Sequence, residues 1–120
     1  MSGQGQWTPG MVADLADGTP YNGVIALLDR CAESPGTWVI KSDVEERLGI
    51  SAIQLRNELA ALSKLTKRLF GQNIWPMQYK KEQGSYYYRM DDPVAKWWLD
   101  SRRAPHIEHS ARRRDPSDQE

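Results

Sequence analysis

The sequence predicts a mainly helical α+β domain, and three observations support this fold class. Apolar residues recur at helical spacing through most of residues 7–70. After Gly71 the pattern changes to alternating apolar and polar residues, which is typical of a β-hairpin. A further helical segment, rich in tryptophan, follows the hairpin. A chain of 120 residues can bury one modest core, so we expect a single domain over residues 7–103.

The two ends of the chain have compositions that disfavour a packed core. Residues 1–6 are Gly, Gln and Ser around one Met, and residues 104–120 are polar with two prolines. We expect both segments to be disordered. The N-terminus lacks the basic and apolar parts of a secretion signal, and no apolar run approaches the length of a membrane span. We therefore expect a soluble, cytoplasmic protein.

Two helices are predicted before residue 33. Thr8-Pro9 favours the start of a short helix that ends at Asp17-Gly18. Thr19-Pro20 repeats this start signal for a helix through about Ala32. The apolar face expected for that helix comprises Tyr21, Val24, Ile25, Leu28 and Ala32. Cys31 is the only cysteine, so it cannot form an intrachain disulfide, and we expect it to be a small buried hydrophobe.

Residues Ser51 to Phe70 form the longest segment that is consistent with one amphipathic helix. Ser51 and Gln54 have the spacing of a capping box, and Gly71 suits the left-handed residue that ends a helix. The face expected to be buried comprises Leu55, Leu59, Leu62, Thr66 and Leu69, with Ala52 and Phe70 at its margin. The opposite face carries Gln54, Asn57, Ala61, Lys64 and Arg68. Amides and cations suit base edges and phosphates in a major groove, although solvent-exposed helix faces often have this composition too.

The segment before this helix predicts a short helix and a tight turn. Thr37 to Ile40 is β-prone and could be a single strand or an extended connection. Ser42 and Glu45 then have the spacing of a second capping box. The apolar residues Val44, Leu48, Ile50 and Leu55, with Gly49 in the turn, resemble the helix-turn-helix of bacterial DNA-binding proteins, here over about residues 42–70. Glu45 departs from the motif, which usually has a small residue there.

The hairpin is predicted over about residues 74–90. Its first strand alternates Trp75, Met77 and Tyr79 with polar residues and Pro76, and a turn follows over residues 81–84. In the return strand, Tyr86, Tyr88 and Met90 share the face expected to contact the long helix, whereas Tyr87 and Arg89 share the other. Helix, helix-turn-helix and hairpin follow one another over about residues 20–90 in the order of a winged helix. Lys80, Lys81 and Gln83 would lie near the tip of the wing.

A closing helix is predicted over about residues 92–102, after Asp92-Pro93. Its adjacent Trp97 and Trp98 diverge by about 100°, so one of them is a candidate for a homodimer contact, unless the segment with Trp7 covers it. The string WPMQYKKEQGSYYYRMDDPVAKWW also resembles the end of an uncharacterised group of actinobacterial winged-helix domains, in which a Trp-Pro strand, a glycine turn and a Tyr-Arg-Met-Asp strand precede a closing helix. That resemblance indicates no partner.

The formal net charge of zero conceals an uneven distribution. Residues 1–37 have a net charge of −3, whereas residues 51–89 have seven cations against Glu58 and Glu82. A local excess of five positive charges can attract a polyanion. The candidate DNA-binding residues are Gln54, Asn57, Ala61, Lys64, Arg68, Lys80, Lys81, Gln83 and Tyr87.

The sequence shows no recognisable machinery for catalysis. It has no core histidine, second cysteine, phosphate-binding glycine loop or convincing paired-carboxylate pattern, so we expect neither an enzyme nor a cofactor or small-molecule ligand. His106 and His109 lie in the polar tail without other plausible ligands nearby, which disfavours a metal site. The Arg112 to Arg114 run could attract phosphates or simply be solvated.

Two functions fit these patterns. The first is double-stranded DNA binding by a small transcriptional regulator, with helix 51–70 in the major groove and the hairpin at the flanking backbone or minor groove. The second is a winged-helix protein-interaction module that binds no DNA, in which the same basic face and Tyr87 bind an acidic protein surface. Net neutrality and Glu58 favour the second, whereas the stripe of amides and cations favours the first.

Overall fold

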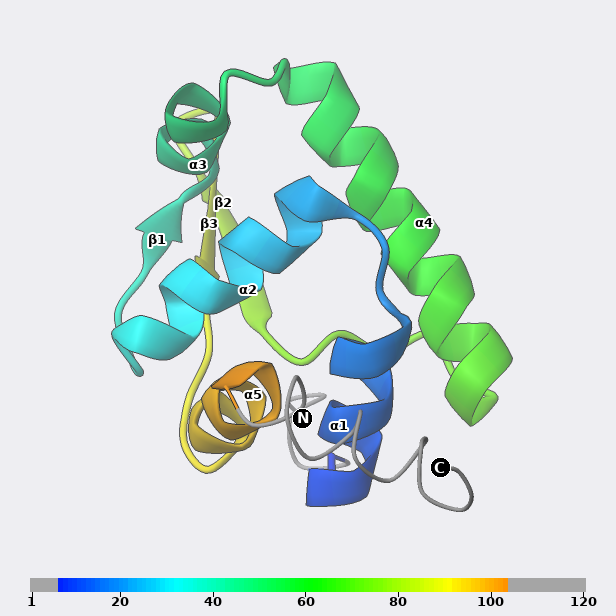
Figure 1. The fold of residues 1–120 in the computed structure, drawn as a ribbon. Helices are drawn as coiled ribbons and strands as arrows, with labels where there is room; N and C mark the ends of the chain where they lie inside the picture. Colours follow the sequence, from blue (N-terminus) through cyan, green and yellow to red (C-terminus); the bar gives the residue numbers. More distant parts are fainter. Residues whose placement is uncertain (1–6, 104–120) are drawn as a thin grey trace.

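The computed structural model describes residues 7–103, and the expected disordered ends lie outside this part of the chain. The described residues form five α-helices and a small three-stranded antiparallel sheet (Figure 1), which confirms a mainly helical α+β fold. In chain order the elements are α1 Pro9–Gly18, α2 Asn22–Glu33, β1 Val39–Ile40, α3 Lys41–Leu48, α4 Ala52–Phe70, β2 Gln78–Glu82, β3 Ser85–Arg89 and α5 Val94–Arg103. None of these helices is long and apolar enough to cross a membrane.

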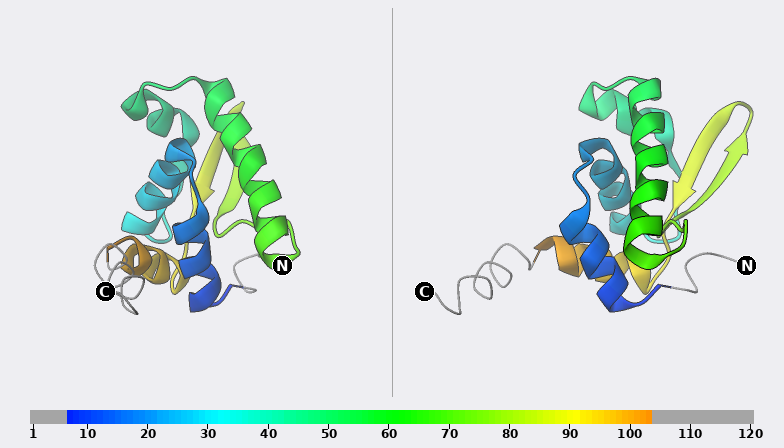
Figure 2. Two further views of the ribbon diagram at one scale, coloured as in Figure 1. Left: turned by 45° about the vertical axis from the view of Figure 1, so that its right-hand side comes forward. Right: turned by 90° about the vertical axis from the view of Figure 1, so that its right-hand side faces the viewer.

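The helices pack around α2. Helix α5 packs against both α1 and α2, and α2 also contacts α3 and α4. Helix α4 runs along one side of the domain, and the β2–β3 hairpin extends away from the body beside it (Figure 2). This arrangement leaves one long side of α4 and much of the hairpin outside the core.

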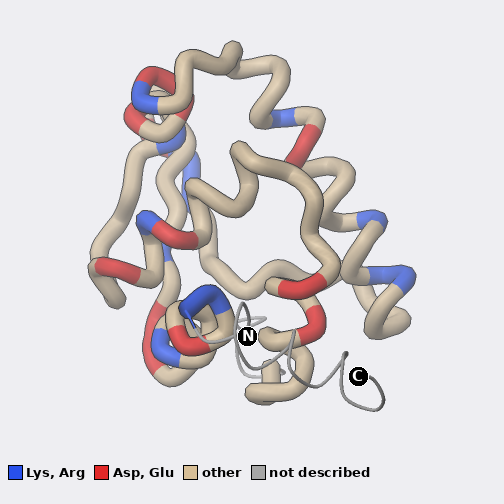
Figure 3. Tube along the Cα trace, viewed as in Figure 1, with Lys and Arg blue, Asp and Glu red and all other residues tan. Residues whose placement is uncertain are grey.

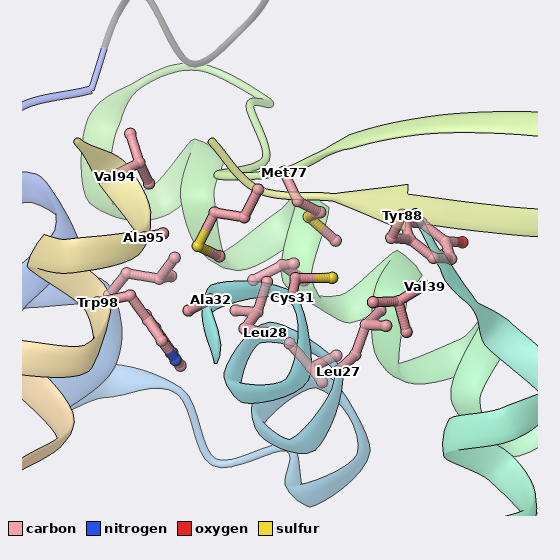
Figure 4. Packing of buried hydrophobic residues seen from close by; sticks show 14 of the residues in the cluster. Leu27, Leu28, Cys31, Ala32, Val39, Met77, Tyr88, Val94, Ala95 and Trp98 are labelled. Carbon is pink, nitrogen blue, oxygen red and sulfur yellow. The ribbon is translucent and has the colours of Figure 1, made fainter. Parts of the chain in front are cut away.

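One hydrophobic core receives buried side chains from all five helices and from the sheet. Figure 4 shows part of this cluster, in which Leu27, Leu28 and Cys31 of α2 pack with Val39, Met77 and Tyr88. Cys31 is fully buried, as predicted, and burial raises the pKa of its thiol to about 12. The thiol therefore stays protonated and acts as a small apolar group at neutral pH.

Helix α4 confirms the predicted ends of the long helix. The hydroxyl of Ser51 accepts a hydrogen bond from the backbone N–H of Gln54 at 3.0 Å, and Gly71 takes the left-handed conformation with φ 77°. Four residues of the predicted buried face are buried, namely Leu55, Leu59, Leu62 and Thr66. Leu69 is 41% exposed and Ala52, expected at the margin of this face, is exposed, so both predictions are wrong. Leu65 is buried although it was not predicted, because the side of α4 that packs against the body, including α1, is wider than one leucine stripe.

Two predicted helix starts are wrong. Thr19 does not open α2, because its hydroxyl and its backbone N–H both donate to the carbonyl of Leu15 and close α1. Helix α2 begins at Asn22 and has no cap from its own segment. Ser42 does not cap α3, which already begins at Lys41, and Glu45 forms an ion pair with Lys41 instead of completing a capping box.

The sheet has the strand order β1-β3-β2, with both pairings antiparallel. A two-residue turn, Gln83-Gly84, joins β2 to β3, and both residues have positive φ angles of 50° and 81°. This geometry matches the right-handed twist of the strands. The hairpin is shorter than predicted, because β2 begins only at Gln78. Pro76 has no backbone N–H to donate to a neighbouring strand, so the residues around it do not extend β2. Trp75, just before it, is held against α4, because its indole N–H donates to the hydroxyl of Ser63 at 2.9 Å.

Candidate nucleic-acid interface

A sharp turn joins α3 to α4. Gly49 ends α3 in the left-handed conformation with φ 70°, and Ser51 caps α4 two residues later. Val44 and Leu55 are buried on either side of this turn, as predicted. Leu48, predicted to share the buried face with Val44, is 43% exposed, because α3 ends there and leaves the core.

The unusual Glu45 is accommodated by a charged partner. Its carboxylate forms an ion pair with Lys41, and both side chains are mostly buried. The Lys41 ammonium also donates to the backbone carbonyl of Ala52 at 3.1 Å. This pair therefore links α3 to the first turn of α4, in place of the close contact that a small residue would make.

The exposed side of α4 carries most of the predicted contact residues. Gln54, Asn57, Lys64 and Arg68 are exposed, and Ala61 is half-buried. Positively charged residues recur along α4 (Figure 3). These cations make no ion pair with any other residue in the described range. Their charge is therefore available to an external anion.

Glu58 has a structural role that the sequence did not indicate. Its Oε1 accepts hydrogen bonds from the backbone N–H groups of Gly23 at 2.8 Å and Val24 at 3.2 Å. It thereby caps the N-terminus of α2, where the helix dipole also favours a negative charge. Its Oε2 accepts from the amide of Gln54 at 3.1 Å. The Glu58 carboxylate is thus held by neutral donors at the side of α4 that meets α2, and Gln54 is partly engaged.

The structure divides the predicted hairpin residues between two sheet faces. Lys80 and Tyr87 lie opposite each other in the β2–β3 register, whereas Lys81 is paired with Tyr86 on the other face. The Lys80 ammonium lies 3.4 Å from Glu82 and 4.6 Å from the ring centre of Trp38, so it is already partnered. Tyr87 is half-buried rather than fully outward-facing, and Gln83 is exposed in the turn.

Sequence reasoning missed several residues on this side of the molecule. Arg56 and Lys67 are exposed, unpaired cations of α4, and Arg56 lines a shallow hollow of about 290 Å³ with residues of the hairpin turn. Ile53 is 65% exposed in the first turn of α4. Helical spacing places Arg56 and Lys67 together on one edge of α4, so the sequence did indicate that these two cations share an edge. The sequence did not indicate that the hairpin lies beside that edge.

The two tryptophans of α5 differ in their availability. Trp98 is fully buried, and its indole N–H donates to Asp29 at 2.7 Å, so it cannot contact a partner. Trp97 is half-buried, and the predicted homodimer contact stays a prediction for this residue alone. Trp7 covers the end of α4 instead, with its ring 5.4 Å from that of Phe70 in an edge-to-face contact.

The described residues contain no group of three or more His, Cys, Asp or Glu side chains that could hold a metal ion. His106, His109 and the Arg112 to Arg114 run lie outside the described residues. Comparisons with protein families, curated proteins and solved structures give no match for this chain. The function is therefore inferred from the surface of the described residues alone.

Proposed function

We propose that this chain is a winged helix-turn-helix domain that binds double-stranded DNA and acts as a small transcriptional regulator. The element order α2-β1-α3-α4-β2-β3 and the strand order β1-β3-β2 support a winged helix. In this proposal α4 enters the major groove as the second helix of the helix-turn-helix. The hairpin beside it, with Lys81, lies at the flanking backbone or minor groove.

The main support for the proposal is that the exposed side of α4 carries cations without ion-pair partners among the described residues. Lys64 and Arg68 are exposed there without ion-pair partners in the described part of the chain. Glu58, the acid of this helix, directs its carboxylate to the backbone of α2. A protruding helix with free cations and few competing acids attracts phosphates, and releasing counterions from DNA makes such binding favourable.

The competing function is a protein-interaction module that uses the same basic face. Exposed apolar side chains favour it, because Leu48 is 43% exposed and Ile53 is 65% exposed near the turn between α3 and α4. An acidic protein with an apolar patch would match this surface. Binding to random-sequence DNA distinguishes the two functions.

A mobility shift with random-sequence duplex at low and moderate salt tests the proposal. Wild type is expected to bind the duplex, more weakly as salt rises. The Lys64→Ala/Arg68→Ala double variant should bind more weakly, whereas Lys96→Ala should match wild type, because Lys96 lies on α5 and pairs with Asp100. Absence of binding at low salt would overturn DNA binding in favour of the protein-interaction module.

Asn57 is the residue best placed to read a base. It is exposed near the N-terminal end of α4, where a helix-turn-helix usually meets base edges. Its amide can form a bidentate contact with adenine, which supplies about 1–3 kcal/mol of discrimination. Selection from a random duplex library should give a motif with wild type, and Asn57→Ala should relax the preference at one position. Identical motifs would show that Asn57 reads no base.

A further inference from the structure

The hairpin carries a row of aromatic rings on the sheet face that includes Lys81. Tyr79 lies at the centre of the row, with its ring 5.6 Å from that of Trp75, 6.3 Å from that of Tyr88 and 6.5 Å from that of Tyr86. These separations lie within the range of favourable aromatic contacts. The rings therefore form one continuous surface rather than isolated side chains.

Only one end of this row belongs to the core. Tyr88 is 3% exposed, whereas Tyr86 is 38% exposed and Tyr79 is 59% exposed. The hairpin extends beyond the body (Figure 2), which leaves both outer rings partly open to solvent. Tyr86 borders a hollow shared with α3 and α4, and Tyr79 borders another with Ser63 of α4. Neighbouring exposed apolar side chains mark a candidate binding surface.

Two cations without ion-pair partners among the described residues, Lys81 and Arg56, lie near the exposed ring of Tyr86. The Lys81 ammonium lies 5.4 Å from the ring centre of Tyr86, and Arg56 of α4 lines the same hollow as Tyr86. Neither cation makes an ion pair with another described residue. The nearby acids are compensated, because Glu45 pairs with Lys41, and Glu82 pairs with Lys80 on the opposite sheet face.

We propose that Tyr79, Tyr86, Lys81 and Arg56 form a binding site for single-stranded DNA. Unpaired bases would stack on the two tyrosine rings while the cations bind the phosphates, a combination that serves single-strand binding in other proteins. A duplex cannot use the rings in this way, because neighbouring base pairs cover the faces of its bases. The inference goes beyond duplex binding and involves residues other than Asn57, Lys64 and Arg68.

Two single strands of equal charge test whether bases are stacked. The probes are a fluorescently labelled oligothymidine and an abasic strand with the same number of phosphates, and binding is measured by anisotropy with the wild-type chain. Each stacked base should favour the oligothymidine by roughly 5- to 150-fold. Equal affinity for the two strands would overturn the proposal, since only phosphates would then be recognised.

Matched variants locate the site. Tyr79→Leu/Tyr86→Leu should remove the preference for oligothymidine, whereas Tyr79→Phe/Tyr86→Phe should keep it because the rings remain. Trp38→Leu is the control and should also keep it, because the Trp38 ring lies against Lys80 and Arg89 on the opposite sheet face. Loss of the preference in the Trp38 variant, or its retention in the double leucine variant, would overturn the assignment to this face. Circular dichroism checks folding, and the wild-type comparison of the two strands needs no variant.

Parallel measurements on duplex DNA separate this inference from the proposed function. Duplex binding without a preference for oligothymidine over the abasic strand would overturn only the single-strand site. A preference for oligothymidine without duplex binding would overturn only the proposed major-groove function.

Discussion

The helical base of the domain, formed by α1, α2 and α5, differs from the side formed by α4 and the hairpin in how its charges are used. In the base, Asp29 accepts hydrogen bonds from the indole of Trp98 and from the guanidinium of Arg102. On α4, Lys64 and Arg68 have no partner among the described residues. Charges of the first kind hold the fold together, whereas charges of the second kind are available to a ligand.

This difference explains why a net charge of zero does not exclude a polyanionic partner. Acids dominate residues 1–37, at a net charge of −3, and these residues supply α1 and α2. Residues 51–89, which supply α4 and the hairpin, have an excess of five cations. Because salt screens exposed charges within about 10 Å, a ligand at α4 experiences mainly the nearby cations. The local charge therefore matters more than the total.

The largest expected effect concerns the helical base of the domain. Trp98→Ala removes a fully buried ring and leaves Asp29 without its indole donor. The free energy of unfolding, measured with urea, should fall by about 3–5 kcal/mol. Trp97→Ala is the matched control and should cost less, because Trp97 is only half-buried. Equal losses for the two variants would mean that Trp98 does not anchor α5.

A smaller effect is expected where the two regions meet, at Glu58. Glu58→Ala leaves the N–H groups of Gly23 and Val24 without their carboxylate, which should lower the free energy of unfolding by about 1–3 kcal/mol. Duplex affinity of the folded variant should rise or stay unchanged, because a negative charge leaves the basic side. The exposed Glu46, changed to Ala, is the control and should alter stability by less than about 0.5 kcal/mol. A stable variant would contradict the capping role.

The buried Cys31 of α2, in the helical base of the domain, should make the free energy of unfolding depend on pH. Burial raises the pKa of its thiol from 9.0 to about 12, so the folded state holds a proton that the unfolded state releases first. This contribution is fully present below pH 9 and is lost as pH rises toward 12, by about 1.4 kcal/mol per pH unit.

The comparison with Cys31→Ala isolates the thiol. Above pH 9 the free energy of unfolding of wild type should fall more steeply than that of the variant, as measured by urea unfolding at several pH values. Burial also raises the pKa of Tyr88, but both proteins retain that contribution. Parallel pH profiles would show that the thiol ionises equally in the folded and unfolded states.

Local sequence signals predicted the elements of the domain better than their partners. Ser51 and Gly71 define the ends of α4 because capping depends on residues within a few positions. The same kind of signal failed at Thr19, since a hydroxyl next to two helices can close the first instead of opening the second. The true cap of α2 is Glu58, which lies 35 residues from Gly23 along the chain and could not be found from local spacing.

The candidate site was predictable on the helix but not on the hairpin. Periodicity of about 3.6 residues correctly placed Asn57, Lys64 and Arg68 on the exposed side of α4. On the hairpin, the alternation of residue types separated the two sheet faces. It could not indicate that Tyr79 is left exposed by the rest of the domain, or that the ammonium of Lys80 lies over the ring of Trp38. Those facts depend on how strands and loops distant in sequence pack together.

The smallest expected effect is a change in salt dependence, and it tests the difference between the two regions directly. Arg68→Ala should weaken binding to all duplexes similarly, because a phosphate contact carries no sequence information. It should also lower the slope of log affinity against log salt by about 1. Between 50 and 200 mM salt, wild type should therefore lose about 3.5-fold more affinity than the variant does.

Lys96→Ala also removes one positive charge, but from α5 in the helical base of the domain, where Lys96 pairs with Asp100 at 3.1 Å. Its salt slope should equal that of wild type, because a cation far from the DNA releases no counterion from it. If the two variants lowered the slope equally, DNA would respond to the total charge of the domain and not to a contact at α4. An unchanged slope for Arg68→Ala alone would leave α4 as a helix face without a phosphate contact at that position, and would shift the expected backbone contacts toward Lys64 and Lys81.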